Sequence, residues 1–148
     1  GSHGMDVYEI AKSLRIFSKI SFLDDNSDHP LVIGKWQDID SHLEDYPVAI
    51  VAVGDTELRK TWTERITAVG YALPILIHPT AFVPENTEIA PGTVICARAT
   101  ISSGVKMGRG SLVGTGSLVP RNTIIPDWGY YNFDQILMDY HNRIQETK

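Results

Sequence analysis

An aliphatic residue or methionine recurs at every sixth position through the second half of the sequence. The series is Val83, Ile89, Ile95, Ile101, Met107, Val113, Val119 and Ile125. Neither an α-helix, with 3.6 residues per turn, nor a strand, whose side chains alternate with period two, repeats at six. A hexad repeat predicts one short strand and one corner per unit. Such a unit can bury its apolar side chain only by stacking on copies of itself as a solenoid.

The residues between these positions suit a corner in each hexad. Three positions after the aliphatic residue, glycine or asparagine recurs, and both tolerate a positive φ angle or a tight turn. These residues are Asn86, Gly92, Gly104, Gly110, Gly116 and Asn122, with Arg98 as the exception. An ordinary β-sandwich with coincidental spacing is the alternative, but it does not account for corner residues that share the same period. The single cysteine, Cys96, follows an aliphatic residue where small side chains recur, and we expect a buried thiol there.

Composition limits the class of protein. The chain has 148 residues, of which 43% are hydrophobic and 21% are charged, so it can form one core and a small second one. No apolar run reaches the length of a membrane span and no signal segment opens the chain, which makes a cytoplasmic location the default expectation. A net charge of −5 without a basic stripe argues against a nucleic-acid partner.

The first half predicts a small α/β domain. A helix begins near Val7, residues 19–25 suit a short strand that ends in two acids, and the apolar run 47–53 suits a central parallel strand. A second helix is expected over 56–69, capped by Asp55 or Thr56 and ended by Gly70. Its inner stripe would be Leu58, Trp62, Ile66 and Val69. Residues 76–79 form a last strand that leads into the hexads.

One element of a doubly wound domain is missing from this order. A strand should precede the loop that opens the first helix, yet the sequence begins at the loop itself, Gly1-Ser2-His3-Gly4. Gly-Ser-His is also a common remnant of a cleaved purification tag. The residues alone leave both interpretations open, a tag remnant or a native glycine-rich turn.

Together the two halves resemble the bacterial sugar acyltransferases typified by sialic-acid O-acetyltransferases and bacillosamine-pathway N-acetyltransferases. The resemblance extends to Asp127 and rests on four pieces: the Gly-Ser-His-Gly loop with its helix, Phe22-Leu23-Asp24-Asp25, Val53-Gly54-Asp55 with Arg59, and Leu76-Ile77-His78-Pro79-Thr80-Ala81. It implies a Rossmann-like domain over 1–79 that lacks its first strand, a short left-handed parallel β-helix over 80–128 and a C-terminal amphipathic helix over 129–148. It also implies a homotrimer that uses acetyl-CoA.

The resemblance carries binding roles onto two groups of residues. A nucleotide-sugar, which we expect to be UDP-linked, would contact Ser2, His3, Gly4, Asp24, Asp25, Gly54, Asp55 and Arg59, and acetyl-CoA would contact Gly114, Thr115 and Gly116. A loop that opens a helix favours a diphosphate through its free N–H groups and the helix dipole. The acids have plainer interpretations, a solvated turn for Asp24 and Asp25 and a helix cap for Asp55. His78 fits packing or a backbone hydrogen bond better than catalysis.

The sequence departs from the family where catalysis is expected. Members carry an Asp-His-Asp element whose histidine is the general base, and Pro120, Arg121 and Asn122 stand in its place. A guanidinium remains charged and cannot accept the proton, so the catalytic residue is unknown. The further coils that hold much of the coenzyme are also missing. We expect no bound metal, and we expect His141 to be solvated.

Three function classes therefore remain. The first is an acetyl-CoA-dependent acyltransferase that acts on an amino or hydroxyl group of a nucleotide-linked sugar. The second is a catalytically silent trimer that binds a nucleotide-sugar. A dinucleotide-dependent oxidoreductase would fit the α/β domain but leaves the hexads unexplained. The tail, in which Phe133, Ile136, Leu137, Tyr140 and Ile144 share helical spacing, would cover the open end of the solenoid or pack on a neighbouring subunit.

Overall fold

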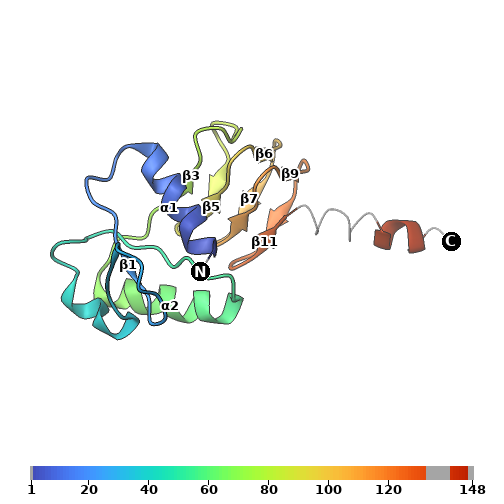
Figure 1. The fold of residues 1–148 in the computed structure, drawn as a ribbon. Helices are drawn as coiled ribbons and strands as arrows, with labels where there is room; N and C mark the ends of the chain where they lie inside the picture. The colour runs from blue at the N-terminus through green and yellow to red at the C-terminus, as the bar shows by residue number, and fades with distance from the viewer. Residues whose placement is uncertain (1, 133–140, 147–148) are drawn as a thin grey trace.

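The computed structural model describes residues 2–132 and 141–146. An α/β unit comes first, with α1 (Ser2–Leu14), β1 (Phe22–Leu23), β2 (Val32–Gly34), the 3₁₀ helix η1 (Trp36–Ser41) and α2 (Thr56–Val69). A solenoid of short strands follows, and Figure 1 shows α1 lying beside it while α2 lies on the other side of the α/β unit. The order of an α/β unit and a hexad solenoid agrees with the sequence prediction.

The solenoid consists of two-residue strands that repeat along three faces. They are β3 (Leu76–Ile77), β4 (Glu88–Ile89), β5 (Val94–Ile95), β6 (Thr100–Ile101), β7 (Lys106–Met107), β8 (Leu112–Val113), β9 (Leu118–Val119), β10 (Ile124–Ile125) and β11 (Tyr130–Tyr131). Every pair is parallel, and the sheet orders are β3-β5-β8-β11, β4-β7-β10 and β6-β9. An isolated bridge between Phe82 and Thr100 continues the last face. Partners are 18 residues apart, as in Ile77 with Ile95, which corresponds to three hexads per coil. The fold is the predicted left-handed β-helix.

The inward series is longer than the sequence pattern suggested. It begins one hexad earlier, at Ile77, and ends one hexad later, at Tyr131, so the solenoid makes about three turns. The inward side chains form one core, and those of Ile95, Ile101, Val113 and Val119 are 0% exposed. Because the strands are only two residues long, this interior column supplies most of the apolar burial.

The corners follow the predicted positions closely. Positive φ angles occur every six residues, at Gly92, Arg98, Gly104, Gly110, Gly116, Asn122 and Trp128. Arg98, the exception in the sequence pattern, adopts the same conformation with φ of 58°. Asn86 does not take a positive φ. The solenoid therefore imposes its corner even where the residue is not glycine, at a local cost on the order of 1 kcal/mol.

The α/β unit is less regular than expected. β1 pairs in parallel with β2, but the predicted central strand over 47–53 is an extended segment that pairs only through a parallel bridge between Val48 and Ala72. Its side chains still alternate between two layers. Ile50 and Ala52 pack toward α1, whereas Val51 packs toward α2. The prediction of a strand buried on both faces is therefore met only in part, because Val51 is buried while Ile50 and Ala52 are half-buried, and regular strand pairing is not seen.

Helix α2 begins and ends where predicted. The Asp55 carboxylate accepts a hydrogen bond from the Leu58 N–H at 2.8 Å, and Gly70 closes the helix with φ of 118°. The predicted inner stripe needs one correction. Leu58 is 46% exposed, whereas Ile66 is buried as predicted and Arg59 and Thr63 are buried beside it.

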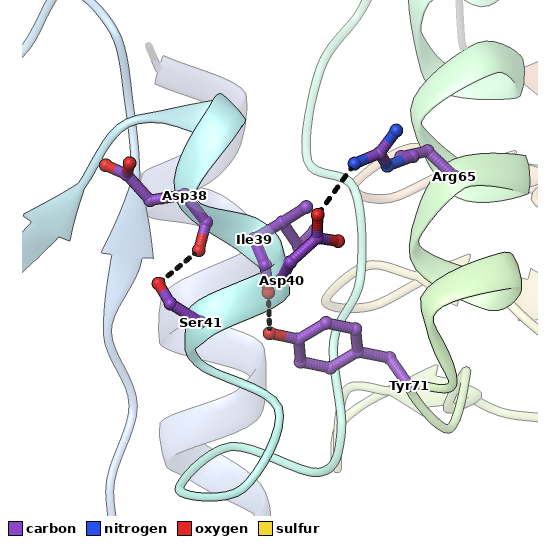
Figure 2. Close-up of polar contacts among 6 residues, drawn as sticks. All are labelled: Asp38, Ile39, Asp40, Ser41, Arg65 and Tyr71. Carbon is purple, nitrogen blue, oxygen red and sulfur yellow. Dashed lines mark hydrogen bonds and ion pairs between the residues drawn. The ribbon is translucent and has the colours of Figure 1, made fainter.

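Helix η1 is held against α2 and the chain that follows it. The Tyr71 hydroxyl donates to the Ile39 carbonyl oxygen at 2.6 Å, and Arg65 forms an ion pair with Asp40 at 3.0 Å (Figure 2). Trp36 and Trp62 stack with ring centroids 4.4 Å apart. Trp36, the first residue of η1, also donates its N–H to the Asp25 carboxylate. Helix η1 therefore links α2 to the turn that carries Asp25.

The α/β unit and the solenoid share a core. One outer face of the solenoid packs against the apolar stripe of α1, so that Val7 and Ile10 are buried with Leu76, Val94 and Leu112. Residues 141–146 are helical and exposed, but Phe133, Ile136, Leu137 and Tyr140 of the predicted C-terminal helix lie outside the described residues. Within the described ranges, no helix is long and apolar enough to cross a membrane.

Candidate functional site

The amino end of α1 lies between the two extended segments of the α/β unit. Gly4 is buried, and a Cβ added there would lie 3.9 Å from the Ala52 carbonyl oxygen and 3.9 Å from the Phe22 ring. The first N–H groups of a helix have no intrahelical partner, and the helix dipole places partial positive charge there. This end of α1 can therefore accept an anionic group close to the backbone.

His3 lies on this first turn and is half-buried. Burial lowers the pKa of its imidazole, the positive charge of Arg59 lowers it further, and Asp6 opposes the shift. The ring is therefore neutral at neutral pH and can either accept or donate a hydrogen bond. The His3 imidazole could therefore contact a ligand through a hydrogen bond without adding a positive charge to the site.

Asp24 and Asp25 line a cavity beside α1, but both carboxylates already hold the turn in place. Asp24 accepts the N–H of Asn26 at 2.9 Å, and Asp25 accepts the N–H of Trp36 at 2.8 Å. The turn interpretation therefore describes what these acids do in the structure, and their contact with a ligand stays a prediction.

Gly54 and Asp55 follow the second extended segment. A Cβ added at Gly54 would meet nothing within 4 Å, so the space beside its backbone is open. The Asp55 carboxylate is the N-cap of α2. The structure thus confirms the cap interpretation, and a role in ligand binding stays a prediction here as well.

Arg59 has a role that the sequence did not predict. Its side chain is 4% exposed, and its guanidinium donates to the carbonyl oxygens of Gly54 at 3.2 Å and Val53 at 3.3 Å. It also donates to two solenoid corners, Gly110 at 3.2 Å and Trp128 at 2.6 Å. Arg59 therefore joins the strand end of the α/β unit to the solenoid. The sequence did contain a signal for this burial. Arg59 lies four positions before Thr63 and seven before Ile66, so it shares the buried face of α2 with them.

A cavity of about 830 Å³ opens within the α/β unit. The structure brings three of the predicted residues to its wall, namely Gly4, Asp24 and Asp25, whereas His3, Gly54, Asp55 and Arg59 do not line it. Most of the wall is apolar and comes from the extended segments and from α1. The cavity therefore includes only the part of the predicted sugar site formed by Gly4, Asp24 and Asp25.

The predicted coenzyme residues form a solenoid corner close to α1. Gly114 is buried, while Thr115 and Gly116 are exposed, with Gly116 at φ of 69°. Burial raises the pKa of the Cys96 thiol to about 11, and the negative charge of Asp6 acts in the same direction. Cys96 packs in one apolar cluster with Val7 and Ile10, so this part of the solenoid lies beside α1. Cys96 is 7% exposed and is a core thiol, as predicted.

The two remaining polar candidates lie on the solenoid. His78 accepts the Thr80 N–H at 3.0 Å, which confirms the predicted backbone hydrogen bond. Thr80 in turn accepts the N–H of Arg98, the corner with positive φ. Arg121 is exposed on its corner, and its correspondence with the family's general base stays a prediction. Among the described residues, no cluster of three or more His, Cys, Asp or Glu side chains could hold a metal ion.

Comparison with known proteins agrees with this architecture. Residues 1–66 match the PglD N-terminal domain family, a match that includes the predicted Gly-Ser-His-Gly loop, of which Ser2, His3 and Gly4 form the first turn of α1. The structure of the acetyltransferase domain of PglB from Neisseria gonorrhoeae FA1090 is 32% identical, with a TM-score of 0.83 over 89% of this chain and 67% of that one. The chain belongs to this family of bacterial sugar acyltransferases.

Two further structures share its fold. The same PglB domain in complex with acetyl coenzyme A matches at 24% identity and a TM-score of 0.69, over 90% of this chain and 89% of that chain. A variant of GDP-perosamine N-acetyl transferase from Caulobacter crescentus, in complex with CoA and GDP-perosamine, matches at 21% identity and a TM-score of 0.81. That match covers 88% of this chain and 64% of the Caulobacter protein. The chain spans 67% of the length of the first of these PglB structures and 64% of the length of the perosamine structure.

Proposed function

We propose that this chain binds a nucleotide-linked sugar and acetyl-CoA and belongs to an enzyme that acetylates the sugar. The observation that carries this proposal is the amino end of α1, where Gly4 packs between Phe22 and Ala52 with free helical N–H groups nearby. Family membership supports the chemistry, because the similar PglB domain is an acetyltransferase domain and one structure of it contains acetyl coenzyme A. The perosamine enzyme holds CoA and GDP-perosamine together.

In this proposal the sugar nucleotide's diphosphate lies at the first turn of α1. The N–H groups of Ser2 and His3 meet the phosphates, and the open space beside Gly54 takes the nucleoside or sugar. The nucleotide that we propose is a uridine diphosphate, with GDP as the comparison. The pantetheine arm of acetyl-CoA passes the exposed corner at Thr115 and Gly116, in the part of the solenoid that lies beside α1.

We further propose that the chain forms a homotrimer through one face of the solenoid. The face of β3, β5, β8 and β11 is covered by α1, and the face of β4, β7 and β10 carries the exposed ion pair of Glu88 and Lys106 at 3.9 Å. The face of β6 and β9 exposes a column of Phe82, Thr100 and Leu118, in which Phe82 is 64% and Leu118 is 52% exposed. An apolar column on a flat face suits burial against a second copy.

The second candidate function is a catalytically silent nucleotide-sugar-binding trimer. The exposed guanidinium of Arg121 favours it, because a positioned general base contributes typically 10²–10⁴-fold to such a reaction. Without that base, we expect acetyl transfer at no more than about a thousandth of the rate of an intact relative. Both candidates bind the nucleotide-sugar, and they differ in the turnover of acetyl-CoA.

Ligand binding and turnover are tested separately. A uridine diphosphate sugar at about a hundred times its Kd should stabilise the protein by roughly 2.7 kcal/mol, a rise of several degrees in melting temperature, whereas acetyl-CoA should give a smaller shift. Asp25→Ala should reduce the shift if its carboxylate contacts the ligand. Asp45→Ala, at an exposed acid far from α1 in sequence, is the matched control. If no nucleotide sugar shifts the melting temperature, the proposal fails.

Turnover is followed by release of free thiol from acetyl-CoA with UDP-linked and GDP-linked amino sugars as acceptors. Arg121→His should raise the rate by about a hundredfold or more if only the base is missing, and Arg121→Gln is the control that removes charge without adding a base. Rapid thiol release by the unaltered chain would exclude the silent binder and indicate a different base.

A further inference from the structure

One exposed arginine occupies a solenoid corner whose backbone conformation suits glycine better. Arg98 has φ of 58°, and its neighbours in the corner series are Gly92 and Gly104. A positive φ brings the Cβ atom of an L-residue too close to a carbonyl oxygen, so arginine is less stable in this conformation than glycine would be. Such conformations persist only where the surrounding structure holds them, and they cluster at functional sites.

The guanidinium of Arg98 is exposed and takes no part in holding the fold together. In the part of the chain that the structure describes, its nitrogens form neither a hydrogen bond nor an ion pair. Arg59, Arg65 and Arg109 differ in this respect, because each donates to another residue. A guanidinium that has no partner in the fold is available to a ligand, and its planar fork of N–H donors matches a phosphate.

A side chain fixes the Arg98 corner in place of the usual backbone bond. At four later corners the N–H donates to the carbonyl oxygen of the residue 19 positions earlier, as at Gly110, Gly116, Asn122 and Trp128. The N–H of Arg98 donates instead to the hydroxyl oxygen of Thr80 at 3.0 Å. Thr80 therefore supplies the acceptor that sets the position of this corner.

His78 orients the Thr80 hydroxyl. Its Nδ1 atom accepts the N–H of Thr80 at 3.0 Å and lies 2.8 Å from the Thr80 hydroxyl oxygen. An Nδ1 that accepts an N–H carries no proton, so the ring proton is on Nε2. The hydroxyl can then donate to Nδ1 while its oxygen accepts the N–H of Arg98. We call this chain of bonds, from His78 through Thr80 to Arg98, the corner clamp.

The Arg98 corner lies next to the corner proposed for acetyl-CoA. Thr115 and Gly116 are exposed one coil further along the solenoid. The N–H of Gly116 donates at 2.9 Å to the carbonyl oxygen of Ala97, the residue before Arg98. Neighbouring strands lie about 4.8 Å apart, a separation that an arginine side chain can span. The exposed guanidinium is therefore close to the proposed path of the coenzyme.

We propose that Arg98 binds a phosphate group of coenzyme A, and that His78 and Thr80 are positioning residues that hold its corner. This inference rests on the proposed function, because it takes the corner at Thr115 and Gly116 as the coenzyme site. Coenzyme A carries a diphosphate and a 3′-phosphate, and either group can accept two parallel N–H bonds from a guanidinium.

Binding is measured by calorimetry with three probes, namely coenzyme A, dephospho-coenzyme A and pantetheine. Arg98→Gln should weaken binding of coenzyme A by about tenfold and leave that of pantetheine unchanged, because only the phosphate contact is lost. A loss that dephospho-coenzyme A shares assigns the diphosphate, and a loss confined to coenzyme A assigns the 3′-phosphate. Lys106→Gln is the matched control, since it removes an exposed positive charge from another face of the solenoid.

Two further substitutions separate the ligand role of Arg98 from the fold. Glycine adopts a positive φ without strain, so Arg98→Gly should melt no lower than the unaltered chain and still lose about tenfold in affinity for coenzyme A. Arg98→Lys should recover part of the affinity, because it keeps the charge but not the planar fork.

The corner clamp is tested by substitutions that keep the shape of the side chain. Thr80→Val removes the hydroxyl, so it should speed hydrogen exchange of the Arg98 amide about fivefold relative to that of Asn122 and weaken binding of coenzyme A. Thr80→Ser should restore both. His78→Asn keeps an acceptor near the position of Nδ1 and should leave the clamp intact. In the unaltered chain, the imidazole nitrogen spectrum of His78 should show the proton on Nε2.

The outcomes distinguish this inference from the proposed function. If the unaltered chain binds none of the three probes, the coenzyme site is refuted and the role of Arg98 with it. Full affinity for coenzyme A in Arg98→Gln, or an equal loss in Lys106→Gln, would overturn the role of Arg98 alone. Full affinity in Thr80→Val, or a ring proton on Nδ1 of His78, would overturn the clamp.

Discussion

Replacing Arg59 by methionine tests whether one side chain joins the two halves of the protein. Methionine keeps much of the length and the apolar stem but removes every hydrogen bond of the guanidinium. Four carbonyl oxygens then lose their donor, two at the strand end and two at solenoid corners. The shortest of these bonds, to Trp128 at 2.6 Å, is charge-assisted and is expected to contribute most.

The magnitude follows from the balance of two effects. Leaving a buried acceptor without its partner costs about 1–3 kcal/mol, and the carbonyls of Gly110 and Trp128 are the two that become enclosed between α2 and the solenoid. Against this, the variant no longer buries a positive charge, a burial whose cost is visible in the lowered pKa of Arg59. We expect a net loss of about 3 kcal/mol, or roughly 6–12 °C in melting temperature for a chain of this size.

The assay compares chemical denaturation of this variant with that of Arg65→Met. Arg65 lies on the same helix and forms an exposed ion pair with Asp40, so its loss should cost at most about 0.5 kcal/mol. Arg59→Lys is a second comparison, because it keeps the charge but cannot reach all four carbonyls. Equal stability of the Arg59 and Arg65 variants would refute the reasoning and show that the apolar contacts of α1 alone join the two units.

Three further predictions concern other parts of the molecule. Ile101→Ala should destabilise the solenoid by about 2–5 kcal/mol in urea unfolding, whereas Ile124→Ala, at a side chain that is 73% exposed, should change little. Cys96 should resist iodoacetamide in the folded protein and react on unfolding. Because burial raises the pKa of its thiol from 9.0 to about 11, the free energy of unfolding should fall as pH rises through that interval. The lowered pKa of His3 has the opposite sign, so stability should be full above pH 6.5 and decline as pH falls below it, and His3→Gln should abolish that decline.

The solenoid was predictable because its determinants are local and repeated. Each hexad contains both its inward aliphatic and its corner, so the pattern from Val83 to Ile125 carried the fold without knowledge of distant contacts. The two hexads at the ends were missed for physical reasons. Ile77 precedes His78-Pro79, which suggested a separate strand, and Tyr131 is aromatic and follows a tryptophan corner. Ile77 and Tyr131 both pack only partly buried against the solenoid core, because each lies at an end of the solenoid.

The two helices of the α/β unit were predictable, but its strands were not, since β2 was not predicted and 47–53 is not a regular strand. The capping of α2 by Asp55 and Gly70 follows from local chemistry, and the structure confirms it. The pairing of 47–53 depends on partners far along the chain, and the structure shows only an isolated bridge between Val48 and Ala72. The hydrogen bond of Asp25 is of the same kind, since Trp36 could be placed against Asp25 only once β1 and β2 were known to pair.

The position of Arg59 reconciles its structural role with the ligand role that the family resemblance implies. Its guanidinium is enclosed and largely occupied by carbonyls, so direct contact with a sugar nucleotide would require breaking those bonds. Burial is the main cause of the lowered pKa of His3, and the positive charge of Arg59 acts in the same direction, so we expect Arg59 to influence the first turn of α1 electrostatically. A positive charge near the amino end of a helix raises the affinity of that end for an anion without contacting the anion. Salt screens this attraction only weakly when the charge is buried. Arg59→Met should therefore weaken binding of a uridine diphosphate sugar more than binding of uridine, whereas Arg59→Lys should weaken both ligands equally if it weakens either. A loss of the same size for both ligands in the methionine variant would mean that Arg59 acts only by holding the fold.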